Sequence, residues 1–457
     1  MEWAGRFGAG GWARLGARPA VLDLHGDGRL LARVTADEYR PDLARAGEGA
    51  GAAAFMRWFA TPLPAGTRLT VTAADGAHLP GSPLRIVPMP MPAAAWRPDE
   101  GEPVALMVDE AAPDPARDAA SAAVLSHAAA LRALGYAVTF ATLAEAPAAL
   151  ACLAGRVRIA WLHRMRPMLD LHMAVRAANP GVRILFVLAD LASLRARRAQ
   201  TVLGGDAAAL AGLCAAEAAA LAAADVVVTH SATEAALLGA AWPALRVAVV
   251  PWAVTPAATA LPPFAARAGI GFIGNFGHAP NRDAARVLLE RVMPLLWQRG
   301  EVPCVIAGFG LPPALTVPAG APVTLLDSPA DAAASVWHRV RVSAAPLRFG
   351  AGIKGKVLDS FAHGVPCLCS PVAAEGLAVP PALIAGDAAA MAARLWHLHQ
   401  DAAANAAAAA DGAARLAPLH DGAAVRRAMA GAVGRPAVSP AGSPRAAPAP
   451  APRPRTA

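Results

Sequence analysis

The sequence predicts an α/β protein with two Rossmann-like domains, preceded by a small β-sandwich and followed by a disordered tail. The 457 residues are too many for one hydrophobic core, which favours two or three domains. From Pro103 onward, short apolar runs alternate with longer helical segments, a pattern typical of parallel sheets. Between residues 341 and 377, a strand, a glycine loop, a helix and a strand indicate the ligand-binding edge of such a sheet.

Residues 1–90 differ from the rest of the chain, because their apolar and polar residues alternate around two tight turns. VLDLHGDGRLLARV surrounds an HGDG turn, and TRLTVTAADGAHLPGSPLRI surrounds an ADG turn. These patterns predict two hairpins, and we expect them to form the small β-sandwich. This module either packs against the rest of the chain or binds carbohydrate or a partner. The proline-rich residues 87–103 indicate a linker.

Residues 101–256 are expected to form the first Rossmann-like domain. Apolar runs at 104–110, 136–142, 158–165 and 183–191 have the length of buried strands, and segments with helical propensity separate them. The carboxyl ends of such strands are where α/β folds hold their ligands. The sequence therefore predicts that this edge of the sheet holds a ligand.

Two polar side chains near that edge have alternative interpretations. Asp118 follows the first strand, and it is either a catalytic group or only the cap of the helix that starts near residue 119. His163 ends a later strand, where a lone histidine is more often a structural side chain with its hydrogen bonds satisfied. Asp118 is thus kept as a catalytic candidate, and His163 is not.

Residues 266–433 are expected to form the second Rossmann-like domain. A strand at 271–273 leads into a turn that contains Gly274 and Asn275, and a helix is expected to start near Asn281. The remaining residues, 434–457, are rich in proline, alanine and arginine and contain no core-forming residues. They predict a disordered tail.

The segment 341–377 carries the features of a phosphate site. Glycines at the mouth of a helix let backbone amides approach an anion, and a helix start carries about half a unit of positive charge. The loop and helix start contain the residues Arg348, Gly350, Gly352, Lys354, Gly355 and Lys356. Asp359 follows in the helix, so a carboxylate for sugar hydroxyls stands beside cations for a diphosphate. A nucleotide diphosphate linked to a sugar fits both; the alternative is an ordinary strand–helix unit whose cations only face solvent.

This segment also resembles a known family. APLRFGAGIKGKVLDSFAHGVPCLCSPVAAEGL, residues 345–377, is similar to the donor-site segment of glycosyltransferases of the family 4 type. The resemblance implies a GT-B architecture, in which two Rossmann-like domains face each other and the second binds most of the nucleotide sugar. YRPDLARAGEGAGAAAF, residues 39–55, more weakly resembles a short module that precedes some bacterial glycosyltransferases.

The resemblance implies roles for individual residues. It places Lys354 and Arg348 near the diphosphate, Asp359 at the ribose and Glu375 opposite the sugar. PARDAAS at 115–121 resembles the family segment that contains Asp118, and GNFGHAPN at 274–281 resembles the family loop whose first glycines face the donor. The catalytic candidates are therefore Lys354, Arg348 and Asp118. The donor-binding candidates are Gly274, Asn275, Gly350, Gly352, Lys356, Asp359 and Glu375.

Two positions depart from the family pattern. Ala351 stands where many members carry a glutamate, and Ala192 stands where a related subgroup carries a histidine. Such losses are also what a protein that no longer catalyses transfer would show. The alternative to an enzyme is therefore a non-catalytic GT-B protein that binds nucleotide sugars or acts as a scaffold.

Composition and charge exclude several other classes. The net charge is +8, but aromatic residues make up only 5% of the chain, which disfavours nucleic-acid binding and favours attraction of anionic donors or membrane surfaces. The mean hydropathy is +0.40, yet alanine supplies much of it and no stretch predicts a spanning helix. The first residues lack the apolar region of a signal peptide, so we expect a cytoplasmic protein, with peripheral contact at the inner membrane face as a further expectation.

The five cysteines indicate no metal site. They are scattered, and Cys367 and Cys369 alternate along an apolar strand, which predicts buried thiols rather than ligands.

The expected function is transfer of a sugar, with retention and without a metal or other cofactor, from a nucleotide sugar to a glycan or lipid-linked acceptor. Bacterial cell-surface polysaccharide assembly is what the resemblance suggests.

Overall fold

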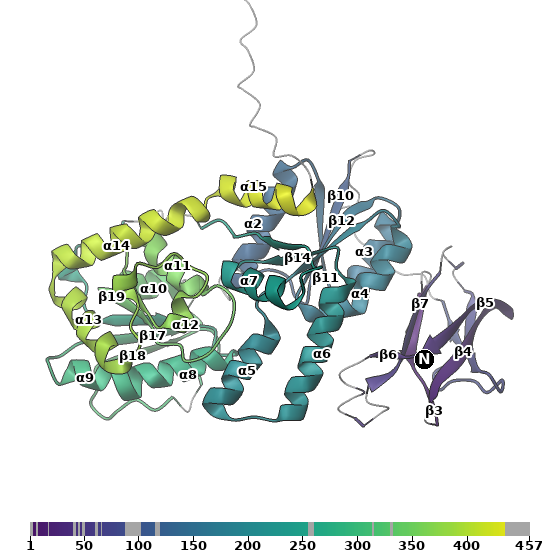
Figure 1. Ribbon diagram of the computed structural model, residues 1–457, viewed down its shortest axis with the longest axis horizontal. Helices are drawn as coiled ribbons and strands as arrows, with labels where there is room; N and C mark the ends of the chain where they lie inside the picture. The colour runs from purple at the N-terminus through teal and green to yellow at the C-terminus, as the bar shows by residue number, and fades with distance from the viewer. Residues whose placement is uncertain are drawn as a thin grey trace, which may run out of the picture.

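The computed structural model describes residues 3–5, 8–16, 18–39, 43, 46–47, 51–59, 63–64, 66–86, 102–114, 119–254, 260–312, 315–329 and 332–434. Asp118, most of the predicted linker and the predicted tail beyond Gly434 lie outside these residues. The described chain forms a β module followed by two α/β domains (Figure 1). The fold class predicted from the sequence is thus confirmed.

The amino-terminal module contains two antiparallel sheets. The first has the order β1 (Trp3–Gly5), β2 (Gly8–Trp12), β7 (Ala52–Trp58) and β6 (Glu38–Tyr39). The second has the order β3 (Arg14–Leu15), β4 (Arg18–Gly26), β8 (Arg68–Ala73) and β9 (Leu84–Arg85), with β5 (Arg29–Ala36) paired to β4.

The first predicted hairpin of this module is present. Asp27 and Gly28, between β4 and β5, both have positive φ, the conformation that a two-residue hairpin turn needs. Alternate residues of the strands, among them Leu22, Leu24 and Val71, are buried in one small core. The module lies on the side of the first α/β domain where β7 contacts helix α4 (Met165–Ala178) (Figure 1).

The first α/β domain is built on a parallel sheet of six strands. Its order is β11 (Ala137–Thr142), β10 (Val104–Asp109), β12 (Val157–His163), β13 (Arg183–Val187), β14 (Val226–Thr229) and β15 (Val247–Val249). Its other helices are α2 (Ala119–Ala133), α3 (Ala146–Leu153), α5 (Ala192–Leu203), α6 (Ala207–Ala223) and α7 (Ala232–Ala241). Every residue of β10 is buried, as the continuous apolar run predicted.

The second α/β domain is built on a parallel sheet of five strands. Its order is β18 (Val323–Asp327), β17 (Cys304–Gly308), β16 (Ile270–Ile273), β19 (Val342–Ala345) and β20 (Cys367–Cys369). Its helical elements are α8 (Ala279–Val287), the π-helical turn Leu288–Val292, α9 (Met293–Trp297), α10 (Ala332–Trp337), α11 (Gly355–Ala362), α12 (Pro371–Ala374), α13 (Ala388–Gln400) and α14 (Ala402–Leu416).

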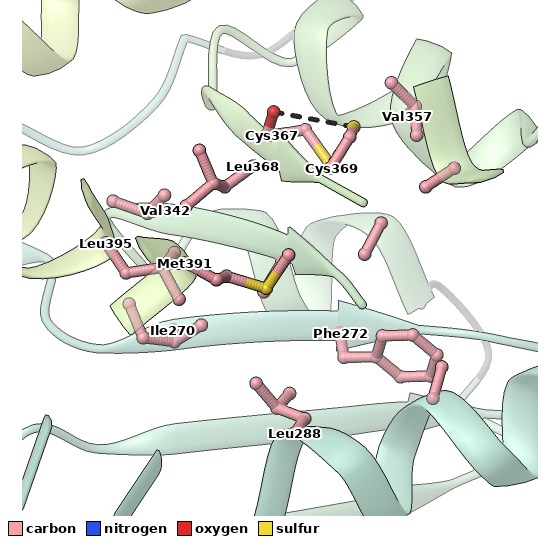
Figure 2. Close-up of a cluster of buried hydrophobic side chains, with 14 of the residues drawn as sticks. Ile270, Phe272, Leu288, Val342, Val357, Cys367, Leu368, Cys369, Met391 and Leu395 are labelled. Carbon is pink, nitrogen blue, oxygen red and sulfur yellow. Dashed lines mark hydrogen bonds between the residues drawn. The ribbon is translucent and has the colours of Figure 1, made fainter. Parts of the chain in front are cut away.

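The core of this domain contains Cys367 and Cys369, the two cysteines that alternate along one strand. Cys367 and Cys369 are fully buried on β20 among Val342, Val357 and Met391, and the Cys369 thiol lies 3.7 Å from the Cys367 carbonyl oxygen (Figure 2). Both thiols are free. The prediction that these cysteines are core side chains is confirmed.

The last helix returns to the first domain. Helix α15 (Gly422–Val433) packs Val425, Met429 and Val433 into the core formed by β10, β12 and α2 (Figure 1). The Arg246 side chain donates a hydrogen bond to the Gly431 carbonyl, 2.8 Å away. The chain thus crosses between the domains twice, which holds the two sheets as neighbours. Among the described residues, no helix has the length and apolarity needed to cross a bilayer.

Both sheets reverse their strand order at a point that faces the same cleft. In the first domain the reversal lies between β10 and β12, and in the second it lies between β16 and β19. Ligands of open α/β sheets bind outside the carboxyl ends of the strands at such a reversal. The loops that follow these four strands are therefore the expected walls of a ligand site.

Candidate functional site

A cleft of about 970 Å³ lies between the two α/β domains. Its lining from the first domain includes Glu110, Arg164, Asp190, Arg195 and Trp252. Its lining from the second domain includes Gly274, Asn275, Gly350, Lys354, Lys356 and Asp359. The volume suits a ligand as large as a nucleotide sugar. Six of the predicted site residues therefore meet at one cleft.

Lys354 directly precedes helix α11, which begins at Gly355. Its side chain is 7% exposed, and its ammonium donates a hydrogen bond to the Gly352 carbonyl, 2.6 Å away. Burial lowers the pKa of Lys354 to about 8, and nearby carboxylates, led by Glu375 and Glu234, oppose this shift. A cation with few hydrogen-bond partners, next to a helix start, is suited to an incoming anion.

Lys356 reaches the cleft from the first turn of α11. Its ammonium donates to the Asn281 side-chain oxygen and lies 4.5 Å from the centre of the Phe272 ring. Burial lowers the pKa of Lys356 to about 7, and the neighbouring charge of Lys354 lowers it further. These two are the only lysines in the sequence, which contains 41 Lys and Arg residues in total. The confinement of both lysines to one short segment is a signal for the site that the sequence itself carries.

Gly274 and Asn275 form the turn that follows β16. The Asn275 side chain accepts a hydrogen bond from the Gly277 amide, and the Asn275 carbonyl accepts one from the Asn281 side chain. At Gly308, the last residue of β17, φ is +142°, and a Cβ there would lie 1.8 Å from the Gly274 carbonyl oxygen. Only glycine permits this approach, so the turn is held in a fixed position at the cleft.

Asp359 lies on the cleft side of α11 and is partly held by a buried tryptophan. One carboxylate oxygen accepts a hydrogen bond from the Trp337 indole nitrogen, 2.9 Å away, and the His363 ring lies 3.5 Å from the other oxygen. The side chain remains 41% exposed. Contact of this exposed part with a sugar hydroxyl stays a prediction.

Arg348 and Glu375 are placed differently from the expectation. Neither is among the described residues that line the cleft. Arg348 forms a two-point ion pair with Asp283, which is buried on α8. Glu375 forms a two-point ion pair with Arg198 on α5 of the first domain, at 2.6 and 2.7 Å. Direct contact of either residue with the donor stays a prediction.

The first-domain wall contains a buried acid–histidine pair. Asp109, at the end of β10, contacts the His163 ring nitrogen Nδ1 at 2.7 Å and accepts a hydrogen bond from Arg164 Nε at 3.0 Å. Burial raises the pKa of Asp109 and these partners lower it, with a net lowering, so the carboxylate stays ionised. The other His163 nitrogen, Nε2, is buried without a hydrogen-bond partner among the described residues. Only one of the two ring nitrogens of His163 thus has a hydrogen-bond partner among the described residues, which the sequence did not predict.

Within the part of the chain that the structure describes, no three His, Cys, Asp or Glu side chains meet in a way that could hold a metal ion. The contacts that sequence reasoning missed are those between distant segments, such as Arg198 with Glu375 and Trp337 with Asp359. Residue types and spacing carried no signal for them.

Comparison with known proteins agrees with this geometry. Residues 267–401 match the family model described as Glycosyl transferases group 1. None of the curated proteins that were compared matches the chain.

Several solved structures have a similar fold. Sucrose-phosphate synthase from Thermosynechococcus elongatus has a TM-score of 0.57 at 18% identity, over 72% of this chain and 98% of that chain. HepE from Anabaena, in complex with UDP and glucose, has a TM-score of 0.52 at 13% identity, over 72% of this chain and 99% of that chain. Trehalose 6-phosphate synthase from Burkholderia multivorans has a TM-score of 0.51 at 12% identity, over 73% and 96%. At these identities the similarity shows the fold alone, which is GT-B.

The cleft, the strand–loop–helix segment and the family match concern the same residues of the second domain. The match covers residues 267–401, and the fold similarity extends over both α/β domains. Residues 267–401 of this chain thus match the group 1 glycosyltransferases, and its two α/β domains have the GT-B fold.

Proposed function

We propose that this protein is a glycosyltransferase that moves a sugar from a nucleoside-diphosphate donor to a glycan or lipid-linked acceptor, with retention of the anomeric configuration. The proposal includes the closer membership in family 4 that the donor segment resembles. It places the reaction in the cytoplasm, with peripheral contact at the inner membrane face, as a step of cell-surface polysaccharide assembly. It requires neither a metal ion nor a further cofactor.

The observation that carries the proposal is the position of Lys354 and Lys356 at the start of α11, inside the interdomain cleft. A diphosphate leaving group gains negative charge as the bond to the sugar breaks. Fixed cations and a helix start stabilise that charge, and such electrostatic stabilisation generally contributes most to catalysis at sites of this kind. Asp359, 41% exposed on the same helix, supplies the carboxylate for a ribose hydroxyl.

Arg348 and Asp118 complete the proposed catalytic set. Arg348 acts through the loop that it fixes to Asp283, since its guanidinium is held by that carboxylate. Asp118 lies in the turn after β10, outside the described residues, and its assignment rests on the resemblance of that turn to the family segment. The proposed donor contacts are Gly274, Asn275, Gly350, Lys356, Asp359 and Glu375. Gly352, predicted as a further contact, is proposed to shape the loop instead, because its amide is bonded to Glu234.

A donor screen tests the function. The purified protein is incubated with UDP-, GDP-, ADP- and dTDP-linked sugars, with lipid-phosphate and oligosaccharide acceptors, in the presence and absence of EDTA. UDP-sugars come first, because the HepE structure of similar fold contains UDP and glucose. We expect release of the nucleoside diphosphate with one donor, unchanged by EDTA, and a product whose anomeric configuration by NMR equals that of the donor.

Two outcomes of the screen contradict parts of the proposal. Binding without turnover for every donor and acceptor would favour the non-catalytic alternative. Turnover that EDTA abolishes, or a product of inverted configuration, would remove the metal-independent or the retaining part and leave transfer itself in place.

The affinity for a nucleoside diphosphate is expected to fall as pH rises. Lys354 and Lys356 have pKa values lowered by burial to about 8 and about 7, so both are cationic below pH 7 and both lose their protons toward pH 9. Calorimetric titration with UDP should show a Kd that rises at least about tenfold between pH 6.5 and 9, because the diphosphate loses two opposite charges.

A direct measurement supports this titration experiment. Protein labelled with ¹³C at lysine Cε gives only two side-chain signals, because the sequence contains only two lysines. Titration of both signals well below the usual lysine value of about 10.4 is the expected result. Two signals that titrate near that usual value would show that burial does not lower the pKa of these lysines. The predicted loss of UDP affinity between pH 6.5 and 9 would then be wrong.

A further inference from the structure

One arginine of the first domain contacts the donor segment at two places. The guanidinium of Arg198 donates to both carboxylate oxygens of Glu375, at 2.6 and 2.7 Å, and to the Gly350 carbonyl at 2.8 Å. Gly350 lies in the loop after β19, and Glu375 follows α12. One side chain of α5 therefore joins two segments of the second domain that are separate in sequence.

A buried carboxylate of the first domain holds the same loop from another side. Glu234 is 2% exposed on α7, and its Oε1 accepts hydrogen bonds from the amides of Gly352 and Leu191, both at 2.8 Å. Its other oxygen accepts from the Thr229 hydroxyl at 2.7 Å. Helix α7 is capped by Ser231, whose hydroxyl accepts from the Glu234 amide. The Glu234 carboxylate thus binds the loop between β19 and α11, residues 346–354, across the domain boundary. We call this loop the donor loop.

The loop approaches the first domain too closely for any residue other than glycine. At Gly352, φ is +66°, and a Cβ would lie 2.8 Å from the Ala189 carbonyl oxygen and 2.9 Å from the Asp190 Cβ. Because the Gly352 amide is bonded to Glu234, it is not directed at a diphosphate. The glycine of this loop therefore serves the domain contact, and the loop's cation, Lys354, faces the cleft.

We propose that Arg198 is a positioning residue: through Glu375 and Gly350 it fixes the donor loop against the first domain, so that Lys354 is held at the donor. This inference rests on the proposed transfer from a nucleotide sugar. Glu234 contributes a second attachment of the same loop, at Gly352. The catalytic contact belongs to Lys354, and Arg198 acts through the loop that carries it.

The neighbouring Arg197 provides a matched control. It belongs to the same helix and has the same side chain, but its guanidinium contacts the Cys214 sulfur of α6 within the first domain, at 3.5 Å. Arg198→Ala removes three charge-assisted hydrogen bonds across the domain boundary, whereas Arg197→Ala removes none of them. A difference between the two variants therefore reports on the donor loop and not on helix α5.

The kinetic test compares Arg198→Ala, Arg198→Lys, Arg197→Ala and the parent with the best donor. We expect Arg198→Ala to lower kcat/KM for the donor about 10- to 100-fold, with a raised donor KM and an unchanged acceptor KM. Arg198→Lys should recover part of the loss, because it keeps the charge but not the two-point contact.

Hydrogen exchange tests the same inference without any turnover. In the unliganded protein, the amides of residues 347–356 should exchange faster in Arg198→Ala than in Arg197→Ala, while the core strand β16 stays unchanged. A parent that turns over donors, with Arg198→Ala equal to Arg197→Ala in both exchange and donor KM, would overturn the inference. A parent without turnover counts against the proposed function instead, and the exchange result still decides whether Arg198 holds the loop.

Discussion

Replacing Lys354 by methionine is expected to lower kcat about 100- to 1000-fold, the usual cost of removing one group that stabilises a developing negative charge. Methionine keeps most of the side-chain volume at this buried position and removes only the charge and its hydrogen bond to Gly352. The measurement is kcat and KM for the best donor, alongside the thermal unfolding midpoint. An unfolding midpoint near that of the parent would show that the loss is one of chemistry.

The pattern of the kinetic constants identifies what Lys354 does. Equal losses in kcat and kcat/KM would mean that its contact strengthens only in the transition state, whereas a raised KM alone would mean binding of donor and transition state alike. Lys356→Met is the matched comparison, since Lys356 is already engaged by Asn281 and the Phe272 ring. It should mainly weaken binding. Transfer at the parental rate by Lys354→Met would exclude this lysine from catalysis.

The local features of the second domain could be predicted because they depend on neighbours in sequence. Apolar spacing and glycines predicted a strand, a loop and a helix in this segment, and the structure has them as β19, the loop after it and α11. A positive φ at Gly364 follows the helix end. The alternation of strands and helices predicted parallel sheets, and the carboxyl-edge rule then brought Gly274 and Lys354 to one cleft. These steps use only chain direction and backbone preference.

The partners of the charged side chains could not be predicted in the same way. Arg198 and Glu375 are 177 residues apart, and Arg348 and Asp283 are 65 residues apart. Each pair forms because of how two elements pack, and no spacing along the chain encodes that packing. Before the structure, Arg348 therefore looked available to a diphosphate, and Glu375 looked available to a sugar. In the structure each of them is engaged in a carboxylate–guanidinium pair, with Asp283 and Arg198 respectively.

Acidification from pH 7 to pH 4 is expected to destabilise the first domain by several kcal/mol, because it contains buried neutral histidines beside the cleft. Burial lowers the pKa of His127 to about 3 and that of His230 to about 4, and their ring centres are 5.3 Å apart. In the neutral His127 ring, Nε2 donates to the Pro251 carbonyl at 3.0 Å and Nδ1 accepts from the Trp161 indole at 3.2 Å. A second proton would sit on His127 Nδ1 and point at the Trp161 indole N–H, so this hydrogen bond would be lost.

The sign follows from the two pKa values of each ring. In the unfolded chain a histidine titrates near 6.5, so between pH 6.5 and 4 the unfolded state binds protons that the folded state refuses. The stabilisation is present above pH 6.5 and is lost as pH falls toward the folded pKa, by about 3 kcal/mol for each ring at pH 4. The unfolding midpoint should therefore fall steeply below pH 6.

His127→Gln separates this effect from general acid unfolding. Glutamine has one donor and one acceptor for the Pro251 carbonyl and the Trp161 indole, but it does not titrate. The variant should lose less stability than the parent between pH 7 and 4, whatever its stability at pH 7. The control is His78→Gln, because His78 is exposed in the β module, and it should leave the pH dependence unchanged. If His127→Gln lost as much stability as the parent between pH 7 and 4, the titration of His127 would not be the cause of the acid sensitivity.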